Sequence, residues 1–565
     1  MSTPPHHRHW PPGVPFTIEV PDESLWDGLA RRATATPDEP GLFFLGSAFT
    51  WGALARDARH LAGALQRLGL GAGDRVLLFS QNCPQFVVAF HAVLAAGGVV
   101  VPVNPMNKAD ELEHYLRDTG ARHAIASSDI AAELGRATAA CPGLAHLVVF
   151  DLADALPTHT TGDDWPATWR AWLPQRHPLP AAGAAAVHVW SALLARAIEP
   201  ALVPRRGDDL ALLPYTSGTT GHAKGCMHTH ATLLHNALGS VRWQDMRPCD
   251  THLIVAPMFH ITGLVVGLLA GLHSGGRLVV LPRWDRRVAA RAIGEHRVTH
   301  WANIPTMVID LLSGDDLDQY QLGSLRYIGG GGASMPDAVG ERLQAQFGLR
   351  YVEGYGLTET AAPTHCNPMH APRLRCLGIP FIGTSALVVD PDTLAPLPDG
   401  QAGEIVVRGP QLFKGYWANE RATAAAFVEI DGQRWFRTGD LGTRDADGYY
   451  TIADRLKRMI NASGFKVWPA EVESLLLRHP AIKEACVIAM RDAYRGESPK
   501  ALVVLHDAQR GRVTPEAIVA WAREHMAAYK VPREVALVDE LPRTASGKVL
   551  WRRAQAAQDA LEVSR

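Results

Sequence analysis

Short apolar runs alternate with amphipathic stretches along the chain from Arg75 onward. Residues 76–79 and 99–103 have the continuous apolar character of buried strands, whereas residues 85–96 between them have helical periodicity. The same alternation continues through residues 110–126 and returns between residues 210 and 328. This pattern predicts βαβ units that build buried, mostly parallel sheets, and therefore an α/β fold.

Two later regions depart from this alternation. Residues 151–206 are rich in Pro, Ala and Thr with isolated Trp residues, which predicts a variable surface excursion. Strand-like runs then follow closely on one another, with PDG and DADG turns between them, and predict a small barrel-like or antiparallel β subdomain. These runs are residues 386–389, 404–407 and 449–452.

The last hundred residues have a different organisation. Helical patterns at 469–478 and 515–527 flank strand-like runs at 485–490 and 501–505, which predicts a small α+β domain. We place the boundary at 454–457. The predicted domains are an N-terminal extension at 1–24, a large N-terminal domain at 25–455 and a C-terminal domain at 456–565.

Composition narrows the class of protein. Of 565 residues, 47% are hydrophobic and 20% are charged, as in globular proteins with a packed core. The 55 basic and 57 acidic residues give a net charge of −2, which argues against a nucleic-acid binder that neutralises phosphates. The longest uncharged stretch, 76–107, is interrupted by polar residues and by Gly97-Gly98, so we expect no transmembrane segment.

The seven cysteines are scattered and form no CxxC pair. This distribution argues against a disulfide framework or a zinc site and favours a reducing, cytoplasmic location. Cys226, directly after a polar loop, is interpreted as a packed structural cysteine.

The strongest chemical signal is the sequence YTSGTTGHAKG at residues 215–225, which follows the apolar run 210–213. Backbone N–H groups and hydroxyls of such a loop can surround a polyphosphate, and Lys224 adds positive charge. The spacing is not that of a Walker A loop. A second polar segment, GYGLTET at 354–360, also follows a strand-like run, and its carboxylate, Glu359, can bind Mg²⁺ on phosphate oxygens.

Five segments occur in one order along the chain: 215–225, 354–360, FRTGDL at 436–441, DRLK at 454–457 and PRTASGK at 542–548. Together they resemble the adenylate-forming superfamily of acyl-CoA synthetases, luciferases and adenylation domains, over about residues 25–555. FKVWPAEVE at 465–473 is most similar to bacterial fatty-acid–CoA ligases, and Asn461 stands where luciferase-like and coumarate-ligase-like members have Lys. The resemblance implies a large N-terminal domain of two βαβ-built sheets and a small, mobile C-terminal domain.

The resemblance also implies roles for individual residues. Glu359, with Thr216, would hold Mg²⁺, Lys224 and the residues around it would bind the β- and γ-phosphates, and Tyr355 would stack on adenine. The implied ATP- and AMP-binding residues are Thr216, Ser217, Gly218, Thr219, Thr220, Gly221, Lys224, Gly332, Ala333, Ser334, Gly354, Tyr355, Gly356, Thr358, Glu359, Asp440, Arg455 and Lys548.

Within this set, Asp440 would bind both ribose hydroxyls, with Arg455 nearby. Lys548 would bridge the acid substrate and the α-phosphate. Lys457 corresponds to the hinge of the C-terminal domain, and Gly464 to a glycine that lines the tunnel for coenzyme A. The catalytic set is thus Lys548, Glu359, Thr216 and Lys224.

The implied reaction is that of an AMP-forming acid–thiol ligase. A carboxylic acid attacks the α-phosphorus of ATP, and the acyl-AMP then reacts with coenzyme A. Because both reactants of the first step are anions, cations must lie between them, which Lys548 and Mg²⁺ would supply. The intact Lys548, Glu359 and Asp440 argue against a non-catalytic scaffold. A carrier protein as acyl acceptor and a homodimer both stay open.

The implied acyl pocket lacks charge. It would be lined by Phe259, His260, Gly263, Leu264, Ile304, Gly330, Gly331 and Gly356, and the four glycines at 329–332 would leave room for an apolar tail or a flat ring. Because an isolated buried charge is costly, amino acids and dicarboxylates are disfavoured. We expect a medium- to long-chain fatty acid, with an aryl or cyclic acid as the alternative.

Histidines near these segments have two interpretations. His260 matches a family position near the acyl carboxylate, where it would orient or gate the substrate, but a lone histidine in an apolar segment is often a core residue. His228, His230 and His235 are expected on one helix after the phosphate loop. Their spacing is not that of a helical metal pair, so we interpret them as structural.

Overall fold

The computed structural model of the chain describes residues 4–158, 162, 164–216, 223–314, 316–332, 334–455, 458, 460–462, 465–467, 469–492, 496–526, 530–543 and 549–563. The chain forms two compact units, which are described separately. The large unit comprises Met1–Ser385, Val407–Phe436 and Asp447–Tyr449. The small unit comprises Ala386–Val406, Arg437–Ala446 and Tyr450–Arg565.

The first sheet of the large unit confirms the alternation of strands and helices in the sequence. Its described strands lie in the order β7 (Ala186–Val189), β6 (His146–Phe150), β5 (His123–Ser127), β3 (Arg75–Phe79), β4 (Val99–Val103), β8 (Leu210–Leu212) and β9 (His228–Thr229). All neighbouring strands are parallel except β8 and β9, which are antiparallel.

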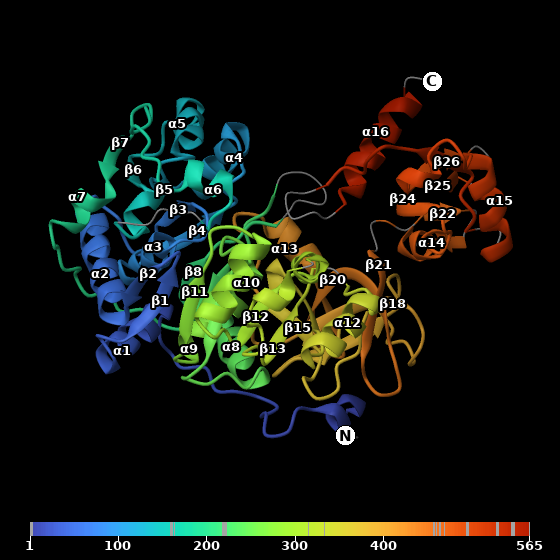
Figure 1. The fold of residues 1–565 in the computed structure, drawn as a ribbon, viewed down its shortest axis with the longest axis horizontal. Coiled ribbons are helices and arrows are strands. Elements are labelled where there is room, and N and C mark those ends of the chain that lie inside the picture. Colours follow the sequence, from blue (N-terminus) through green and yellow to red (C-terminus); the bar gives the residue numbers. More distant parts are fainter. Residues whose placement is uncertain are drawn as a thin grey trace. The chain divides into compact units, whose positions relative to one another are not determined.

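Both faces of this sheet are buried, which explains the continuous apolar runs. Along β3, Val76 and Leu78 belong to one core cluster, whereas Leu77 and Phe79 belong to another. The second cluster includes residues of α4 (Ala109–Thr119) and α5 (Ala131–Ala140), which cover the outer face (Figure 1).

The second sheet of the large unit lies against the same central core. Its described strands lie in the order β16 (Ile379–Pro380), β15 (Ala362–Cys366), β14 (Val352–Leu357), β13 (Tyr327–Gly330), β12 (His300–Asn303), β10 (Thr251–Ile254), β11 (Arg277–Val280), β1 (Pro40–Phe44) and β2 (Ser47–Thr50). From β14 to β1 successive strands are parallel to one another, whereas β15 and β2 run antiparallel to β14 and β1. The carboxyl ends of the parallel strands therefore meet at one edge.

Helices fill the space around these sheets. Along α3 (Pro84–Ala95) every residue from Pro84 to Leu94 is buried, because the helix packs within the central core on all sides. The other helices of the large unit are α1 (Leu25–Ala35), α2 (Trp51–Arg67), α6 (Ala167–Trp172), α7 (Trp190–Leu194), α8 (His230–Trp243), the π-helix η3 (Gly263–Leu269), α9 (Ala270–His273), α10 (Arg286–Glu295), α11 (Pro305–Ser313), α12 (Asp337–Phe347) and α13 (Glu420–Ala426). Short 3-10 turns are η1 (Pro5–His9), η2 (Leu152–Ala155), η4 (Leu317–Gln319) and η5 (Thr358–Thr360).

The prediction of a surface excursion at 151–206 is wrong in part. This region supplies the edge strand β7, and four of its apolar side chains are buried, namely Trp169, Leu173, Trp190 and Leu193. An edge strand needs an apolar face on one side only, so its sequence lacks the continuous run that marks the inner strands.

A five-stranded sheet provides the predicted barrel-like β subdomain. Its described strands are β17 (Ser385–Val389), β18 (Gly403–Arg408), β20 (Gln433–Arg444) and β19 (Phe427–Ile430) in that order, with β21 (Tyr450–Arg455) paired to β20. Within the large unit β19 pairs with the first residues of β20, and within the small unit β21 pairs with the last. The sequence missed β19 and β20, because their apolar residues are interrupted by charged ones.

The rest of the small unit has the predicted α+β pattern. Its sheet consists of β23 (Phe465–Val467), β22 (Ile460–Ala462), β25 (Gly496–Leu505), β24 (Ile482–Asp492) and β26 (Glu534–Leu537). Its helices are α14 (Pro469–Leu476), α15 (Pro515–His525) and α16 (Trp551–Val563), with the 3-10 turn η7 (Asp507–Gln509). The domain boundary at 455/456 stays a prediction.

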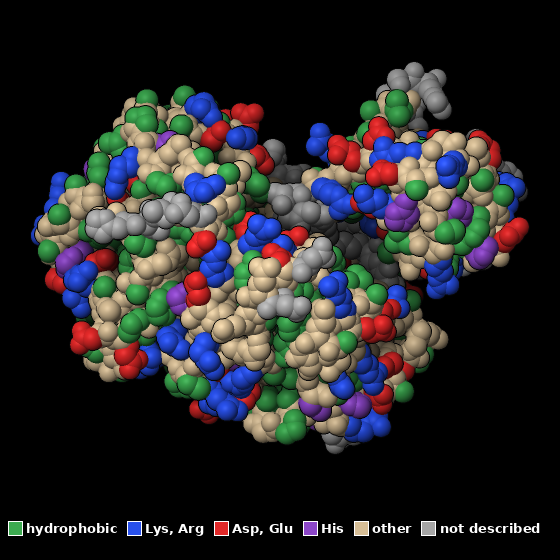
Figure 2. Space-filling view, in the orientation of Figure 1, with side chains coloured by type: hydrophobic (Ala, Val, Ile, Leu, Met, Phe, Trp, Pro, Cys, Tyr) green, Lys and Arg blue, Asp and Glu red, His purple; other side chains and the backbone are tan. Residues whose placement is uncertain are grey.

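Surface composition agrees with the near-neutral charge. Figure 2 shows basic and acidic side chains interspersed over the visible face. All seven cysteines are free, as expected. No helix that the structure describes offers the uninterrupted apolar length that a bilayer crossing requires.

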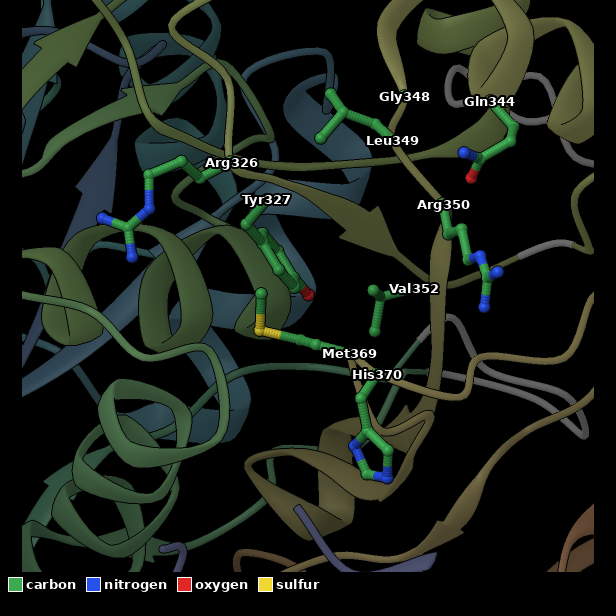
Figure 3. Close-up of a pocket in the computed structure, with 9 residues that line it drawn as sticks. All are labelled: Arg326, Tyr327, Gln344, Gly348, Leu349, Arg350, Val352, Met369 and His370. Atoms are coloured by element: carbon green, nitrogen blue, oxygen red, sulfur yellow. The ribbon is translucent and has the colours of Figure 1, made fainter. Parts of the chain in front are cut away.

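A polar surface cavity of about 410 Å³ opens at the amino-terminal edge of the nine-stranded sheet (Figure 3). Tyr327 and Val352, which line it, are the first residues of β13 and β14. Arg326 at its rim is paired with Asp245 and Asp250. The cavity therefore lies at the opposite edge from the predicted nucleotide-binding segments, which follow the carboxyl ends of the same strands.

Glycines in β13 allow the sheet to form. A Cβ atom added at Gly330 would lie 1.7 Å from the carbonyl oxygen of Asn303 in β12, and one at Gly329 would lie 2.4 Å from that of Val352 in β14. These glycines are thus required by close approach of neighbouring backbones, rather than by space for a substrate.

We predict that Gly330→Ala destabilises the large unit by about 3 kcal/mol or more, because the added methyl group meets backbone that cannot move without breaking the sheet. Gly323→Ala is the matched control, because a Cβ atom there meets nothing within 4 Å. Denaturant unfolding of both variants measures the difference. Equal midpoints would contradict the proposed clash.

Candidate active site

The polar loop predicted to bind phosphates is closed at its base. Residues 217–222, which include Ser217, Gly218, Thr219, Thr220 and Gly221, lie outside the described part of the chain. At the base, the Thr216 N–H donates to the Lys224 carbonyl at 3.0 Å, and Tyr215 pairs with Gly225. The Lys224 N–H donates to Thr216 Oγ1 at 3.4 Å. Thr216 and Lys224 therefore face each other across two arms of one hairpin.

Helix α4 holds both arms of this hairpin. The Tyr215 hydroxyl donates to the Asp118 carboxylate on one arm. On the other arm His114 Nε2 donates to the Ala223 carbonyl at 2.7 Å. Burial and the charge of Asp118 raise the pKa of Tyr215, so the phenol stays protonated and keeps donating. The sequence does not reveal these supports, because no motif marks them.

A tyrosine lies between the two charged residues of the predicted site. Lys224 Nζ lies 4.0 Å from the ring centroid of Tyr416, as in a cation–π contact. At the far end of the ring the Tyr416 hydroxyl donates to Glu359 Oε1 at 2.7 Å. Burial and the charge of Glu359 raise the pKa of Tyr416. The structure thus brings Lys224 and Glu359 together, and it adds Tyr416, which the sequence did not reveal.

The turn that carries Thr358 and Glu359 is fixed through its carbonyl groups. His228 Nε2 donates to the Thr358 carbonyl at 2.7 Å, and the Phe413 N–H donates to the Glu359 carbonyl at 2.9 Å. Asn236 Nδ2 lies 3.0 Å from the Thr360 carbonyl and 2.8 Å from that of Ala361. Four consecutive carbonyls are therefore bound by donors from other segments.

Strand register places the other predicted residues at the same edge. Across three parallel strands Asn303 is paired with Gly330, and Gly330 with Glu353. The next residues, Ile304, Gly331 and Gly354, thus lie side by side where β12 and β13 end, at the carboxyl edge at which α/β sheets bind ligands. Strand β14 itself continues to Leu357, paired with β15. Gly332 has φ +87° and open space around it, which suits the turn away from the sheet. Ala333 lies outside the described residues, and Ser334 is exposed.

The other residues predicted to bind adenine or the acyl group differ in how far solvent reaches them. Gly356 is exposed, and Tyr355 is half-buried, with its ring centroid 5.8 Å from that of buried His365. His260 is exposed, not a core histidine, and its Nδ1 accepts from the Thr262 N–H at 3.4 Å. Phe259 is half-buried.

Gly263 and Leu264 begin the π-helix η3 and are buried. A Cβ atom on Gly263 would lie 2.2 Å from the Pro257 carbonyl, so only glycine fits there. π-Helical turns are frequent at functional sites, which agrees with the predicted place of an acyl pocket.

Two predictions about neighbouring residues have clear outcomes. Cys226 is fully buried, and burial and the charge of Glu359 raise the pKa of its thiol, as expected for a packed cysteine. His228, however, is not on a helix with His230 and His235. It lies in β9, and α8 begins only at His230.

Glu353 joins two of the predicted segments. Its side chain is buried, and Oε1 accepts from the Arg375 N–H at 2.7 Å and from the Met335 N–H at 3.3 Å. Met335 directly follows the predicted site residue Ser334, and Glu353 directly precedes Gly354. Burial outweighs these donors and raises the pKa of Glu353 to about 7.

Within the small unit, the predicted residue Asp440 is fully buried in β20. Its N–H lies 3.1 Å from Thr438 Oγ1, and Glu404 supports the same turn by accepting from the Gly439 N–H at 3.1 Å. Asp440 is paired with Arg455 across β20 and β21, as the predicted proximity of these two residues requires. The predicted residues Lys457, Gly464 and Lys548 lie outside the described part of the chain.

Comparison with known proteins gives matches over most of the chain. The family model "AMP-binding enzyme" matches residues 29–417, and "AMP-binding enzyme C-terminal domain" matches residues 471–548. A long-chain-fatty-acid–CoA ligase of Bacillus subtilis (strain 168) is 34% identical over 559 residues, covering 98% of each chain. A feruloyl-CoA synthase of an Amycolatopsis species is 33% identical, covering 94% of this chain and 98% of the relative.

A solved structure has the same architecture. The anthranilate CoA ligase AuaEII in complex with anthranoyl-AMP matches with a TM-score of 0.79 at 26% identity, covering 97% of this chain and 99% of that chain. The likeness confirms the predicted fold, with a large N-terminal and a small C-terminal domain.

The raised pKa of Glu353 predicts a stability that falls with pH. A carboxyl group whose pKa rises from 4.5 to about 7 on folding binds more protons in the folded chain than in the unfolded chain. Its contribution to the free energy of unfolding is therefore complete below pH 4.5 and is lost as the pH rises through 7. Between pH 4.5 and 8 the loss is on the order of 3 kcal/mol. Glu353→Gln should remove this loss, as measured by denaturant unfolding at a series of pH values. The exposed Glu341→Gln is the control, and parallel curves for wild type and Glu353→Gln would contradict the prediction.

Proposed function

The chain belongs to the AMP-binding enzyme family and is an AMP-forming acid–thiol ligase, and we propose that its acid substrate is a medium- to long-chain fatty acid. ATP and coenzyme A are its co-substrates. In the proposed reaction the fatty acid and ATP give acyl-AMP and pyrophosphate. The acyl group then passes to coenzyme A, and AMP leaves.

The proposed substrate class rests on one observation, which is that the segments of the predicted acyl pocket contain no charged residue. Residues 259–264, 301–306, 328–334 and 354–357 contain no Asp, Glu, Lys or Arg, and Leu264 among them is buried. A second charged group on the substrate would find no partner there. The relationship over the full length to a long-chain-fatty-acid–CoA ligase supports the same substrate class.

An aryl or cyclic acid is the second candidate. It is favoured by a feruloyl-CoA synthase among the relatives at 33% identity and by the likeness to an anthranilate CoA ligase. A ring is apolar and flat, so an uncharged pocket also suits it.

We propose that the described residues act by binding and orienting charge. The carboxylate of the acid and the phosphates of ATP repel each other, and positive groups held in place lower that repulsion without reorganising during the reaction. Lys224, with the loop that precedes it, would bind the β- and γ-phosphates, and Thr358 would donate its hydroxyl to the α-phosphate. Lys548 would supply the charge between acid and phosphorus.

The donor set at Glu359 fits Mg²⁺. Oε1 of this half-buried carboxylate accepts from Tyr416, whereas Oε2 has no hydrogen-bond partner among the residues that the structure describes. One carboxylate oxygen of Glu359 and the Thr216 hydroxyl would hold the ion, and such hard oxygen donors are the ligands that Mg²⁺ prefers. When bound, the ion would neutralise phosphate charge.

The small unit completes the proposal. Asp440 would accept hydrogen bonds from both ribose hydroxyls, with Arg455 beside it in the paired strand. Lys457 would be the hinge of the C-terminal domain, and Gly464 would line the path of coenzyme A.

Acid-dependent formation of pyrophosphate tests the proposed function. With ATP, Mg²⁺ and coenzyme A, we expect fatty acids of medium or long chain to give the highest kcat/KM in a panel that includes aryl and cyclic acids. A preference for aryl acids would replace the first candidate by the second. Acyl-AMP without acyl-CoA, whichever acid is supplied, would instead indicate a carrier protein as acceptor.

Two variants test the separate roles proposed for Lys548 in acyl-AMP formation and for Gly464 in thioester formation. Lys548→Ala should lower the rate of acyl-AMP formation at least about 100-fold, because it removes the charge between the two anions, and should still convert supplied acyl-AMP to acyl-CoA. Gly464→Leu should spare acyl-AMP formation and block thioester formation, because a side chain fills the proposed tunnel. Rapid-quench assays of each half-reaction give both rates. Equal loss of both half-reactions in either variant would contradict its assigned role.

A further inference from the structure

His228 connects the phosphate loop to the turn that carries Thr358 and Glu359. It lies in β9, which pairs with β8 at Leu212, so it belongs to the returning arm of the loop and to the seven-stranded sheet. Thr358 follows β14 of the nine-stranded sheet. The bond from His228 Nε2 to the Thr358 carbonyl, 2.7 Å long, thus joins two sheets at the predicted site.

The surroundings of His228 fix which ring nitrogen carries the proton. The Thr358 carbonyl can only accept, so a contact of 2.7 Å requires a proton on Nε2. Nδ1 lies 3.1 Å from Thr232 Oγ1, whose one hydroxyl proton also reaches the Thr229 carbonyl at 2.9 Å, so this contact does not require a proton on Nδ1. The ring is fully buried, and burial lowers the pKa of His228 to about 4. Near neutral pH the ring is therefore a neutral Nε2–H donor.

We propose that His228 is a positioning residue that sets the spacing between the phosphate loop and the Thr358–Glu359 turn. The proposal rests on the proposed function, in which the loop binds the β- and γ-phosphates and Thr358 binds the α-phosphate. A triphosphate spans both elements, so its binding requires a fixed distance between them. AMP has only the α-phosphate, so its binding does not depend on that distance.

No other described contact replaces this bond. Phe413 and Asn236 hold the carbonyls of the following residues, Glu359 to Ala361, whereas the Thr358 carbonyl receives its donor from His228. Without His228 the carbonyl of half-buried Thr358 would lose this donor, or the turn would move to find another.

His230 offers a matched control. It is as buried as His228, and burial lowers its pKa to about 4 as well. Its Nδ1 accepts from the Leu25 N–H at 3.1 Å, in α1 and away from the turn. Loss of His230 should therefore cost stability without changing the spacing of the site.

The experiment compares His228→Leu, His228→Gln and His230→Leu in the full chain. Calorimetric titration measures the affinity for ATP with Mg²⁺ and for AMP, and acid-dependent pyrophosphate release gives kcat and KM. In His228→Leu we expect ATP affinity and the adenylation rate to fall about tenfold or more, as is usual when a group that orients a ligand-binding residue is lost, and AMP affinity to fall less than about threefold. His228→Gln, whose amide can donate to the same carbonyl, should stay within about threefold of wild type.

The other possible results would overturn either the positioning role of His228 or the proposed function. Equal weakening of ATP and AMP in His228→Leu, or an effect no larger than that of His230→Leu, would overturn the positioning role. If His228→Leu does not fold, His228→Met takes its place, and the comparison with His228→Gln decides in the same way. Wild-type protein that releases no pyrophosphate with any acid would refute the proposed function, whereas the ratio of ATP to AMP affinity would still test His228.

Discussion

A carbonyl oxygen can accept a hydrogen bond but cannot donate one, and this constraint governs the candidate site. From Thr358 to Ala361 the backbone presents four consecutive carbonyls, and each is bound by a donor from another segment. A buried carbonyl without a donor would cost about 1–3 kcal/mol, so the turn has one favourable position. The side chains of Thr358 and Glu359 take their places from that position, and the antiparallel pairing of β14 with β15 on either side of the turn fixes it further.

Tyr416 keeps the two charges of the site close without letting them neutralise each other. A direct ion pair between Lys224 and Glu359 would occupy the oxygen and the ammonium donors that a metal–phosphate complex needs. Instead the ammonium lies over the ring, and one carboxylate oxygen receives the phenol hydroxyl. Because the pKa of Tyr416 is raised, the phenol remains a neutral donor and adds no third charge. Both charged groups thus keep capacity for a ligand.

The sequence predicts the inner strands and the charged residues of the site, and it fails where geometry is set by distant segments. Continuous apolar runs identify β3, β4 and β5, because both faces of that sheet are buried. Local periodicity says nothing of His114, Tyr416 and His228, which lie 109, 57 and 130 residues from the groups that they hold. The glycines at 329–330 were predicted to leave room for a substrate, but neighbouring backbones occupy that space. The substrate argument therefore depends on missing charge and not on missing side chains.

Burial of Cys226 suits the second step of the proposed reaction, in which coenzyme A attacks acyl-AMP. An acyl-AMP is a mixed anhydride that a thiolate attacks readily, so a reactive cysteine beside the phosphate loop would compete with coenzyme A for the acyl group. Only the thiolate is strongly nucleophilic, and both burial and the nearby charge of Glu359 raise the pKa of Cys226. Burial is the larger cause of this rise in the pKa, and the charge of the carboxylate proposed to hold Mg²⁺ adds to it. One negative charge serves both purposes, because it attracts a cation on its open side and disfavours a second anion in the core behind it.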